Sequence, residues 1–320
     1  MALYLLSNIR AQYPEAKLGI MVASRGGMLR DLLAAYPWIE VVEANRRNPA
    51  SLLRLWREWR GSDLVVTQYG GKHGGSFSLP SKLVARILAK RGGLVGFTDT
   101  AARLNARVYD HLLPVRPDKA VAEHEREALR AAGLSVPLPY PEFAPVRKNG
   151  VPEHYGIRAP YAILHVFAGN RGRSLSPARS RELLTELRKA APDVSYVVSA
   201  GPADGEDARK IADGLGTVVQ APLQDIANLI AESRFVVSVD TGVAHISAQM
   251  GKPLIVLATC LGPNWWFPEQ YGPRSAKAFV NNPKACESGH IYVDYPPCIN
   301  DFNARAVAQA ATSITVARTS

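Results

Sequence analysis

The chain has 320 residues, 47% of them hydrophobic and 21% charged, which excludes a disordered protein and predicts two globular domains of about 150 residues each. Its formal net charge of +10 favours anionic partners, but the cations are scattered, which argues against nucleic-acid binding. No apolar stretch approaches the roughly 18 residues of a membrane-spanning helix, and no secretory signal is expected. Three sparse cysteines, Cys260, Cys286 and Cys298, exclude a disulfide framework and predict a cytoplasmic protein.

Short apolar runs alternate with amphipathic segments along the chain, the pattern of βα units around parallel sheets. In the first half, strands are expected at residues 18–22, 38–42, 64–67 and 94–97, and helices at residues 28–35, 49–60, 79–89 and 118–132. The helix from Pro49 is expected to bury a stripe that contains Leu52, Leu53, Leu55, Trp56 and Trp59.

The stretch from residue 133 to 160 contains six prolines and is predicted to link two domains, residues 1–150 and 151–320. The alternation then restarts, with strands expected at residues 161–167, 194–199, 235–239 and 254–257, and helices at residues 178–191, 206–215, 223–232, 243–250 and 303–317. This order predicts two Rossmann-like halves whose parallel sheets face a cleft, with ligands beyond the carboxyl ends of the strands.

The most informative stretch follows the apolar strand at residues 235–239. Asp240, Thr241 and Gly242 turn directly into a helix, and His245 lies one turn inside it. Asp or Thr can cap such a helix, and glycine lets another group approach the backbone closely. The free N–H groups and the positive dipole end would then bind a pyrophosphate. From these residues alone, an ordinary capped helix with a hydrogen-bonded histidine is an equally good interpretation.

The order of these residues, followed by Gly251-Lys252-Pro253, an apolar strand and a loop with Gly262-Pro263 and Pro268, resembles glycosyltransferase family 9. That family contains the ADP-heptose:lipopolysaccharide heptosyltransferases. The resemblance implies a GT-B fold, with a C-terminal domain that binds the nucleotide sugar and an N-terminal domain that binds the acceptor. It places Asp240, Thr241, Gly242 and His245 at the diphosphate and sugar of the donor.

Two further segments complete the predicted donor site. The loop at residues 165–177 contains Asn170 and Arg173, and Arg173 stands where the family has a phosphate-binding Lys within Lys-x-Trp-Pro. Arginine keeps the charge but differs in geometry, and a solvated basic loop is the alternative. At residues 199–207 the resemblance implies a carboxylate that binds the ribose hydroxyls. Glu206 is our assignment and Asp204 the alternative.

Candidates for acceptor binding are weaker. The glycine-rich stretch at residues 68–76 follows a predicted strand and contains Lys72 and His73, and Arg25 follows an earlier one. We interpret these residues as acceptor contacts, although a surface loop explains them equally well. The stretch has no P-loop spacing.

The N-terminus departs from the family pattern. Family members open with a strand and a Gly-Asp loop, whose Asp is assigned as general base, ahead of a helix that ends near Tyr-Pro. Here Leu3 and Ile9 lead directly to Tyr13-Pro14. We therefore expect Met1 to lie inside that helix, the first strand to be missing and the base to lie before Met1. The alternative is a protein that has lost its base.

The resemblance thus implies an inverting transfer of a heptose or related sugar from an ADP-sugar to a lipopolysaccharide core or similar anionic glycolipid. The resemblance implies no strict dependence on a metal, and the sequence has no Asp-x-Asp motif that would hold one, so no cofactor or metal is expected. Peripheral contact with the inner membrane is expected from the basic charge and the acceptor class. The alternatives are a non-catalytic nucleotide-sugar-binding protein and a sugar-nucleotide epimerase of the same architecture.

Overall fold

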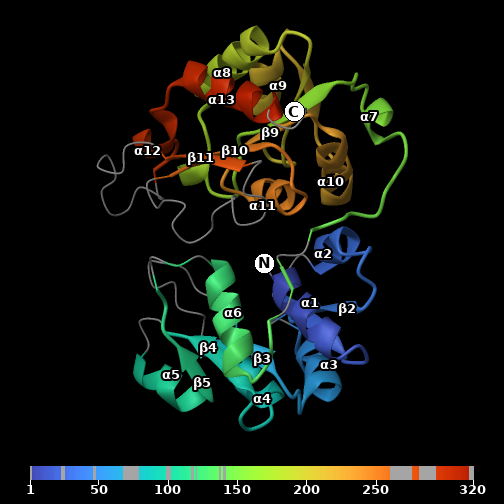
Figure 1. The fold of residues 1–320 in the computed structure, drawn as a ribbon, viewed down its shortest axis with the longest axis vertical. Coiled ribbons are helices and arrows are strands. Elements are labelled where there is room, and N and C mark those ends of the chain that lie inside the picture. The colour runs from blue at the N-terminus through green and yellow to red at the C-terminus, as the bar shows by residue number, and fades with distance from the viewer. Residues whose placement is uncertain are drawn as a thin grey trace. The chain divides into compact units, whose positions relative to one another are not determined.

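The computed structural model describes residues 2–22, 26–45, 48–67, 79–98, 102–116, 119, 121–136, 138–139, 142–259, 276–280 and 293–316. The chain divides into two compact units, Met1–Pro141 and Glu142–Pro263 with the C-terminal residues. Both units combine helices with parallel strands (Figure 1). The predicted α/β class with parallel sheets is confirmed.

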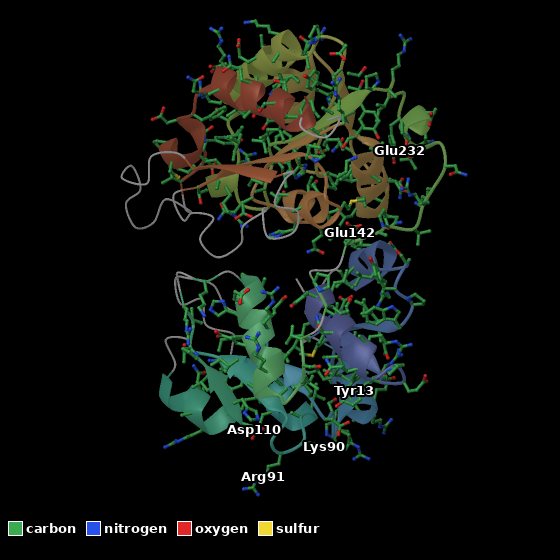
Figure 2. All side chains as sticks on the ribbon, viewed as in Figure 1. Tyr13, Lys90, Arg91, Asp110, Glu142 and Glu232 are labelled. Atoms are coloured by element: carbon green, nitrogen blue, oxygen red, sulfur yellow. The ribbon has the colours of Figure 1, made fainter. Side chains whose placement is uncertain are left out.

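The first unit alternates helices and strands. Its elements are α1 (Ala2–Gln12), β1 (Leu18–Val22), α2 (Gly26–Leu32), β2 (Ile39–Glu43), α3 (Pro49–Trp59), β3 (Val65–Val66), α4 (Leu79–Leu88), β4 (Leu94–Phe97), α5 (Ala102–Val108), β5 (His111–Leu113) and α6 (Val121–Ala131). Helix α1 ends just before Tyr13, which is 54% exposed (Figure 2). The predicted elements are present with their ends shifted by a few residues. The sequence missed α5 and β5, because elements this short show no clear periodicity.

The buried face of helix α3 differs from the apolar stripe that the sequence predicts. The Asn48 side chain caps its start by accepting hydrogen bonds from two first-turn N–H groups at 3.1 and 3.4 Å. Leu55 is 3% exposed, whereas Leu53 and Trp56 are 47% and 38% exposed. The prediction that these two belong to the buried stripe is wrong, because one helix can turn only part of its surface toward a sheet. Trp56 instead stacks with the Arg60 guanidinium, 4.5 Å from its ring centroid.

The strands of the first unit form two separate parallel sheets, β2-β1 and β3-β4-β5. Among the described residues, β1 and β3 are not paired with each other, and their edges border a cavity of about 1520 Å³. This space is partly open to solvent.

The segment predicted to link the domains contains the division between the two units, but it packs along both of them. In the first unit, the Gln12 side chain donates to the Ser135 carbonyl at 2.8 Å and accepts from its N–H at 3.0 Å. In the second unit, Asp225 accepts from Lys148 Nζ at 2.6 Å and from the Tyr155 hydroxyl at 3.0 Å. The described parts of this segment are docked to the unit on their own side.

The second unit is built on a six-stranded parallel sheet with the order β11-β10-β9-β6-β7-β8. Its elements are α7 (Val151–His154), β6 (Tyr161–His165), the 3₁₀ helix η1 (Arg171–Arg173), α8 (Pro177–Ala190), β7 (Ser195–Ser199), α9 (Gly205–Ala212), β8 (Thr217–Val219), α10 (Leu223–Glu232), β9 (Val236–Val239), α11 (Gly242–Gln249), β10 (Leu254–Ala258), β11 (Ala276–Val280), α12 (Pro297–Asn300) and α13 (Ala304–Val316). Helices α8, α9 and α13 cover one side of the sheet, and α10 and α11 the other (Figure 1). The sequence missed α7, η1, β8, β11 and α12, all of them short.

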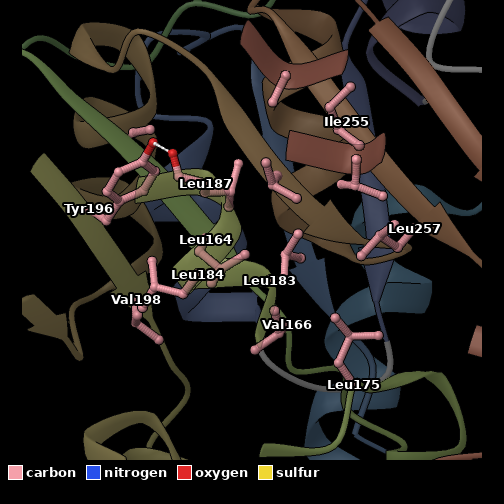
Figure 3. Packing of buried hydrophobic residues seen from close by; sticks show 14 of the residues in the cluster. Leu164, Val166, Leu175, Leu183, Leu184, Leu187, Tyr196, Val198, Ile255 and Leu257 are labelled. Atoms are coloured by element: carbon pink, nitrogen blue, oxygen red, sulfur yellow. Dashed lines mark hydrogen bonds between the residues drawn. The ribbon is translucent and has the colours of Figure 1, made fainter. Parts of the chain in front are cut away.

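The largest apolar cluster lies between this sheet and α8, α9 and α13 (Figure 3). Leu183, Leu184 and Leu187 of α8 are at most 1% exposed and pack toward Val198 of β7. The Tyr196 hydroxyl is also buried, and it donates to the Leu187 carbonyl at 2.7 Å. Complete burial of such side chains contributes roughly 1.5–3 kcal/mol each. The strands that end at the carboxyl edge of the sheet are therefore held by a well-packed apolar core.

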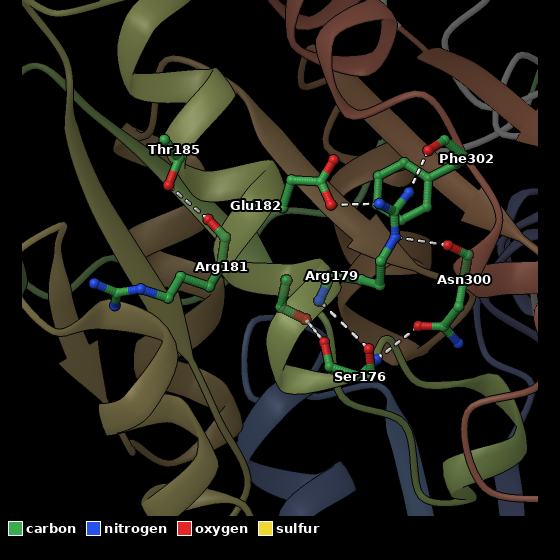
Figure 4. A network of polar contacts seen from close by, with 8 residues as sticks. Ser176, Arg179, Arg181, Glu182, Thr185, Asn300 and Phe302 are labelled. Atoms are coloured by element: carbon green, nitrogen blue, oxygen red, sulfur yellow. Dashed lines mark hydrogen bonds and ion pairs between the residues drawn. The ribbon is translucent and has the colours of Figure 1, made fainter.

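A polar network holds the C-terminal segment against the start of α8 (Figure 4). The Ser176 N–H donates to Asn300 Oδ1 at 2.7 Å, and Arg179 Nε donates to the Asn300 carbonyl at 2.8 Å. The Arg179 guanidinium also contacts Glu182 and the Phe302 carbonyl. This network fixes the end of the loop that follows β6. Of the helices in the described ranges, none is both long and apolar enough to cross a bilayer.

Candidate functional site

Three of the predicted segments meet at one edge of the second sheet. Strands β9, β6 and β7 are neighbours and run parallel, so their carboxyl ends lie at the same edge. The loops that leave this edge contain residues 240–242, 166–176 and 200–204. The structure thus brings together the stretches around Asp240, Arg173 and Asp204, which lie far apart in the sequence.

The start of α11 is open. Thr241 occupies the N-cap position in an extended conformation, with φ −147° and ψ 178°, but its side chain makes no capping hydrogen bond. Its hydroxyl instead lies 3.4 Å from the Val239 carbonyl. A methyl group added at Gly242 would meet nothing within 4 Å, so packing within the described residues does not demand glycine there. No side chain among the described residues therefore caps the first-turn N–H groups, and uncapped groups of this kind can bind an anion.

His245 is a neutral imidazole at this helix start. Burial lowers its pKa to about 3, and the positive charge of Arg173 adds to the effect. Its Nε2 lies 3.8 Å from Asp240 Oδ1, and the side chain remains 25% exposed. At neutral pH this pair is therefore not a salt bridge. A neutral histidine at this position can donate or accept a hydrogen bond without adding charge.

The loop after β6 gives its two predicted residues different roles. Asn170 Oδ1 accepts from the Gly172 N–H at 2.8 Å and thereby shapes the η1 turn. Arg173 is exposed, and no hydrogen bond or ion pair to its guanidinium is found in the described part of the chain. Arg173 is thus the cation of this loop that is available to an anion, whereas the oxygen of Asn170 is already engaged.

The two candidate carboxylates also differ. Glu206 is 76% exposed and pairs with Lys210 one turn along α9 at 2.7 Å, an interaction that lowers its pKa. Asp204 is partly buried at the start of the same helix. Burial raises the pKa of Asp204, and the Arg171 charge opposes that rise. The alternative carboxylate, Asp204, is therefore the more buried of the two, and the charge of Arg171 acts on it.

The sequence reasoning missed a small cluster around Tyr295. The Tyr295 N–H donates to the Arg171 carbonyl at 3.3 Å, and the Arg171 guanidinium lies 5.9 Å from the Tyr295 ring centroid and 3.8 Å from Asp294. Tyr295 has a positive φ of 54°, which is unusual for a bulky residue. Its only signal in the sequence is an aromatic residue before two prolines. The cluster borders Asp204 and extends the site toward the C-terminal segment.

The sequence analysis also did not predict that His165 lies at the carboxyl edge of the second sheet. It is the last residue of β6, and its Nδ1 lies 2.9 Å from the Ser199 hydroxyl and 3.1 Å from the Ser199 carbonyl at the end of β7. Burial lowers its pKa to about 4. This neutral histidine therefore ties the ends of two neighbouring strands together beneath the site.

Several predicted features lie outside the described residues. These are the acceptor candidates Arg25, Lys72 and His73, and the Gly-Pro loop at residues 262–268. Where side chains are described, no group of three or more His, Cys, Asp or Glu residues is arranged to hold a metal ion.

Residues 78–268 match the family model described as glycosyltransferase family 9 (heptosyltransferase). This chain belongs to glycosyltransferase family 9. Lipopolysaccharide heptosyltransferase 1 of Salmonella typhimurium is 25% identical over 153 residues, which cover 47% of this chain and 48% of that protein. The Escherichia coli K12 protein of the same name is 38% identical over 65 residues, 19% of each chain. The chain thus spans about half the length, or less, of these curated relatives.

Solved structures of family 9 resemble the whole chain. Escherichia coli ADP-heptose lps heptosyltransferase II has a TM-score of 0.73 at 16% identity, covering 99% of this chain and 95% of that one. A family 9 glycosyl transferase from Veillonella parvula also scores 0.73, at 14% identity, with coverage of 98% and 94%. The E. coli heptosyltransferase WaaC with ADP scores 0.70 at 18% identity, with the same coverage. The GT-B fold predicted from the sequence is confirmed.

The low pKa of His165 predicts a pH-dependent loss of stability. Its pKa falls from 6.5 to about 4 on folding, so the unfolded chain binds a proton before the folded chain does as the pH falls below 6.5. Its contribution is therefore present above pH 6.5 and is lost toward pH 4. Between pH 7 and 5, the wild type should lose about 2 kcal/mol more stability than His165→Gln, at 1.36 kcal/mol per pKa unit. Urea unfolding of both proteins at each pH measures this, and parallel pH profiles would contradict it.

Proposed function

We propose that this family 9 chain transfers a heptose or related sugar from an ADP-sugar to a lipopolysaccharide core or similar glycan acceptor, with inversion at the anomeric carbon. The observation that carries the proposal is the open start of α11, where no side chain caps the helix and the space beside Gly242 is empty of described atoms. Family membership and the ADP complex of the related WaaC structure support the choice of donor.

In the proposed mechanism, the diphosphate of the donor lies at the N-terminus of α11. The peptide N–H groups and the helix dipole stabilise negative charge there. Arg173 is exposed in the neighbouring loop and adds a full positive charge. Negative charge grows on the diphosphate as the bond to the sugar breaks, so groups held in place for it stabilise the transition state more than the ground state.

His245 and Asp240 have complementary roles in this proposal. The low pKa of His245, about 3, keeps the ring neutral, so it hydrogen-bonds to the sugar or diphosphate without binding a proton itself. Asp240 lies 3.8 Å from it and binds a sugar hydroxyl. The acceptor hydroxyl must also lose its proton to a base, and we assign none of the described residues to that role. An anionic glycolipid acceptor and peripheral membrane contact stay predictions.

A turnover assay tests the central proposal. Purified protein is incubated with ADP-heptose and a lipopolysaccharide core acceptor that lacks heptose, and release of ADP and the mass of the glycan are followed. Transfer of heptose with production of ADP is the expected result. Binding of ADP-heptose without turnover would instead favour the non-catalytic nucleotide-sugar-binding protein, and absence of binding would reject both. A changed sugar without transfer would favour the epimerase.

The variant Gly242→Ala should weaken ADP binding without destabilising the fold, so it tests the two effects separately. The new methyl group has room in the described structure, and alanine favours a helix over glycine by about 0.5–1 kcal/mol. Thermal stability should therefore stay level or rise. The methyl group occupies the place we propose for the diphosphate, so the Kd for ADP should rise at least tenfold, about 1.4 kcal/mol. Isothermal titration calorimetry measures the affinity.

The matched control for that variant is Gly27→Ala. Gly27 lies in α2 of the other unit, and a methyl group there would come no closer than 4.0 Å to the Arg30 side chain. ADP affinity should not change in this control. Equal affinities of Gly242→Ala and the wild type would contradict the proposed position of the diphosphate.

Two isosteric substitutions decide between the ribose carboxylates. We propose that Asp204 binds the ribose, because Glu206 is exposed and already paired with Lys210. Asp204→Asn should weaken ADP binding about tenfold or more, since a hydrogen bond to a charged group contributes roughly 1.5–3 kcal/mol. Glu206→Gln should leave the affinity within about twofold, since exposed ion pairs contribute little. The opposite ranking would restore Glu206 as the ribose ligand.

A further inference from the structure

The outer side of α4 carries an apolar stripe. Leu79, Leu83 and Ile87 are spaced four residues apart, so they lie along one side of the helix. They are 50%, 47% and 61% exposed, whereas Ala85 and Leu88 on the opposite side are buried. A surface helix ordinarily turns its apolar residues to the core and polar residues to solvent. Here both sides carry apolar residues, and packing within the first unit accounts for only one of them.

Helix α3 continues this apolar surface. It packs beside α4 and buries Leu55, while Leu53 and Trp56 are exposed. Since both helices turn their buried residues to the interior, their exposed sides belong to the same outer surface. We call the five exposed side chains the apolar face: Leu53, Trp56, Leu79, Leu83 and Ile87. Single exposed hydrophobic residues are ordinary, but several large ones on neighbouring helices indicate a contact surface.

The apolar face stands outside the cavity of the first unit. None of its five side chains lines that space of about 1520 Å³. A groove suits a single peptide or helix, whereas an outward face of separate side chains suits a fluid layer that adapts to it. Leu, Ile and Trp beside arginine are residue types with which proteins enter the boundary between lipid headgroups and acyl chains. The Arg60 guanidinium stacks on the Trp56 ring at this face, 4.5 Å from the centroid.

The charge around the apolar face is positive, which is an independent observation. Residues 49–66, 79–98 and 102–113 hold α3, α4 and the elements beside them, and they contain nine Lys and Arg but three Asp and Glu. Each of the three acids, Glu58, Asp63 and Asp110, pairs with a cation of the same region. Arg57 and Arg91 are exposed, and no ion pair to either is found in the described part of the chain. Arg91 points away from the unit beyond the end of α4 (Figure 2).

We infer that the apolar face binds an anionic lipid bilayer, with its side chains among the upper acyl chains and the surrounding cations at the headgroup phosphates. Charge decides between the occupants. Two copies of this face would bring two cationic rims together and repel each other, whereas anionic headgroups attract each rim. The predicted peripheral membrane contact thus acquires a specific surface on the first unit. Lipid binding there needs neither the sugar donor nor the acceptor, so it is independent of the proposed transfer.

Vesicle flotation tests this surface. The 320-residue chain is mixed, without nucleotide or glycolipid, with vesicles of phosphatidylcholine alone or of equal parts phosphatidylcholine and phosphatidylglycerol. The wild type should bind the anionic vesicles at least about tenfold more tightly than the neutral ones, because several cations approach the headgroups. The double variant Leu83→Gln/Ile87→Gln should weaken binding to the anionic vesicles at least about tenfold, because two apolar side chains no longer transfer to lipid.

The matched control replaces two exposed valines of the second unit. Val146 and Val293 are 40% and 55% exposed, and Val146→Gln/Val293→Gln should leave vesicle binding within about twofold. Both double variants alter exposed side chains, so their thermal midpoints should stay near that of the wild type. A charge variant, Arg91→Gln, should weaken binding to the anionic vesicles about fivefold and leave binding to the neutral ones unchanged.

Trp56 reports on the contact in the unmodified chain. Lipids that carry bromine in their acyl chains quench the fluorescence of an indole that enters the bilayer. Such lipids in anionic vesicles should quench the wild type, and Trp56→Phe should lose most of this quenching while it still floats with the vesicles. This readout does not depend on the folding of the glutamine variants.

Four outcomes would overturn the inference. The first is that the wild type binds neither kind of vesicle. The second is that the leucine–isoleucine variant and the valine control lose binding equally. The third is binding that disappears at high salt, where exposed charges are screened, and that Leu83→Gln/Ile87→Gln leaves unchanged, which would mean that charge alone holds the protein. The fourth is self-association that this variant abolishes without any change in vesicle binding, which would make the apolar face an interface between two copies of the chain.

Discussion

Every strand of a parallel sheet has two edges of hydrogen-bonding groups, and both must be paired or hydrated. In the second unit six strands satisfy this requirement along one continuous sheet. Since all six are parallel, the loops after β9, β6 and β7 leave at the same edge, above a core that is almost fully buried. In the described part of the first unit, β1 pairs only with β2 and β3 only with β4, and a pocket lies beside both strands. This constraint therefore accounts for the loops of the candidate site leaving the sheet at one edge.

The electrostatics of the candidate site depend on two neutral histidines as well as on its charged residues. Burial lowers the pKa of His165 and His245 to about 4 and about 3, so neither ring adds positive charge at neutral pH. Among the described residues near this edge, the loop after β6 contributes exposed arginines, and the helix start of α11 adds a dipole. An anion in this region would be held by oriented dipoles and a small number of full charges, an arrangement suited to a leaving diphosphate.

Local pairing decides which charged residues remain available to a ligand. Glu206 and Lys210 are one turn apart on α9 and satisfy each other, and Asn170 uses its oxygen on its own turn. Arg171 contacts Tyr295 and Asp294, which belong to the C-terminal segment. Arg173 is exposed, and no hydrogen bond or ion pair to its guanidinium is found among the described residues. The hydrogen bonds and ion pairs that a side chain already makes therefore indicate its availability to a ligand better than its residue type does.

The sequence by itself determined the α/β class, most strands and helices, and membership of the glycosyltransferase family, because periodicity and the Asp240–His245 motif are local features. It did not determine that Leu53 and Trp56 of α3 face outward, or that Glu206 is exposed and paired with Lys210 while Asp204 is partly buried. Only the tertiary structure decided these points, since exposure and pairing depend on elements that lie far away along the chain. The Arg171–Tyr295 contact, formed across more than a hundred residues, shows why no local pattern could reveal it.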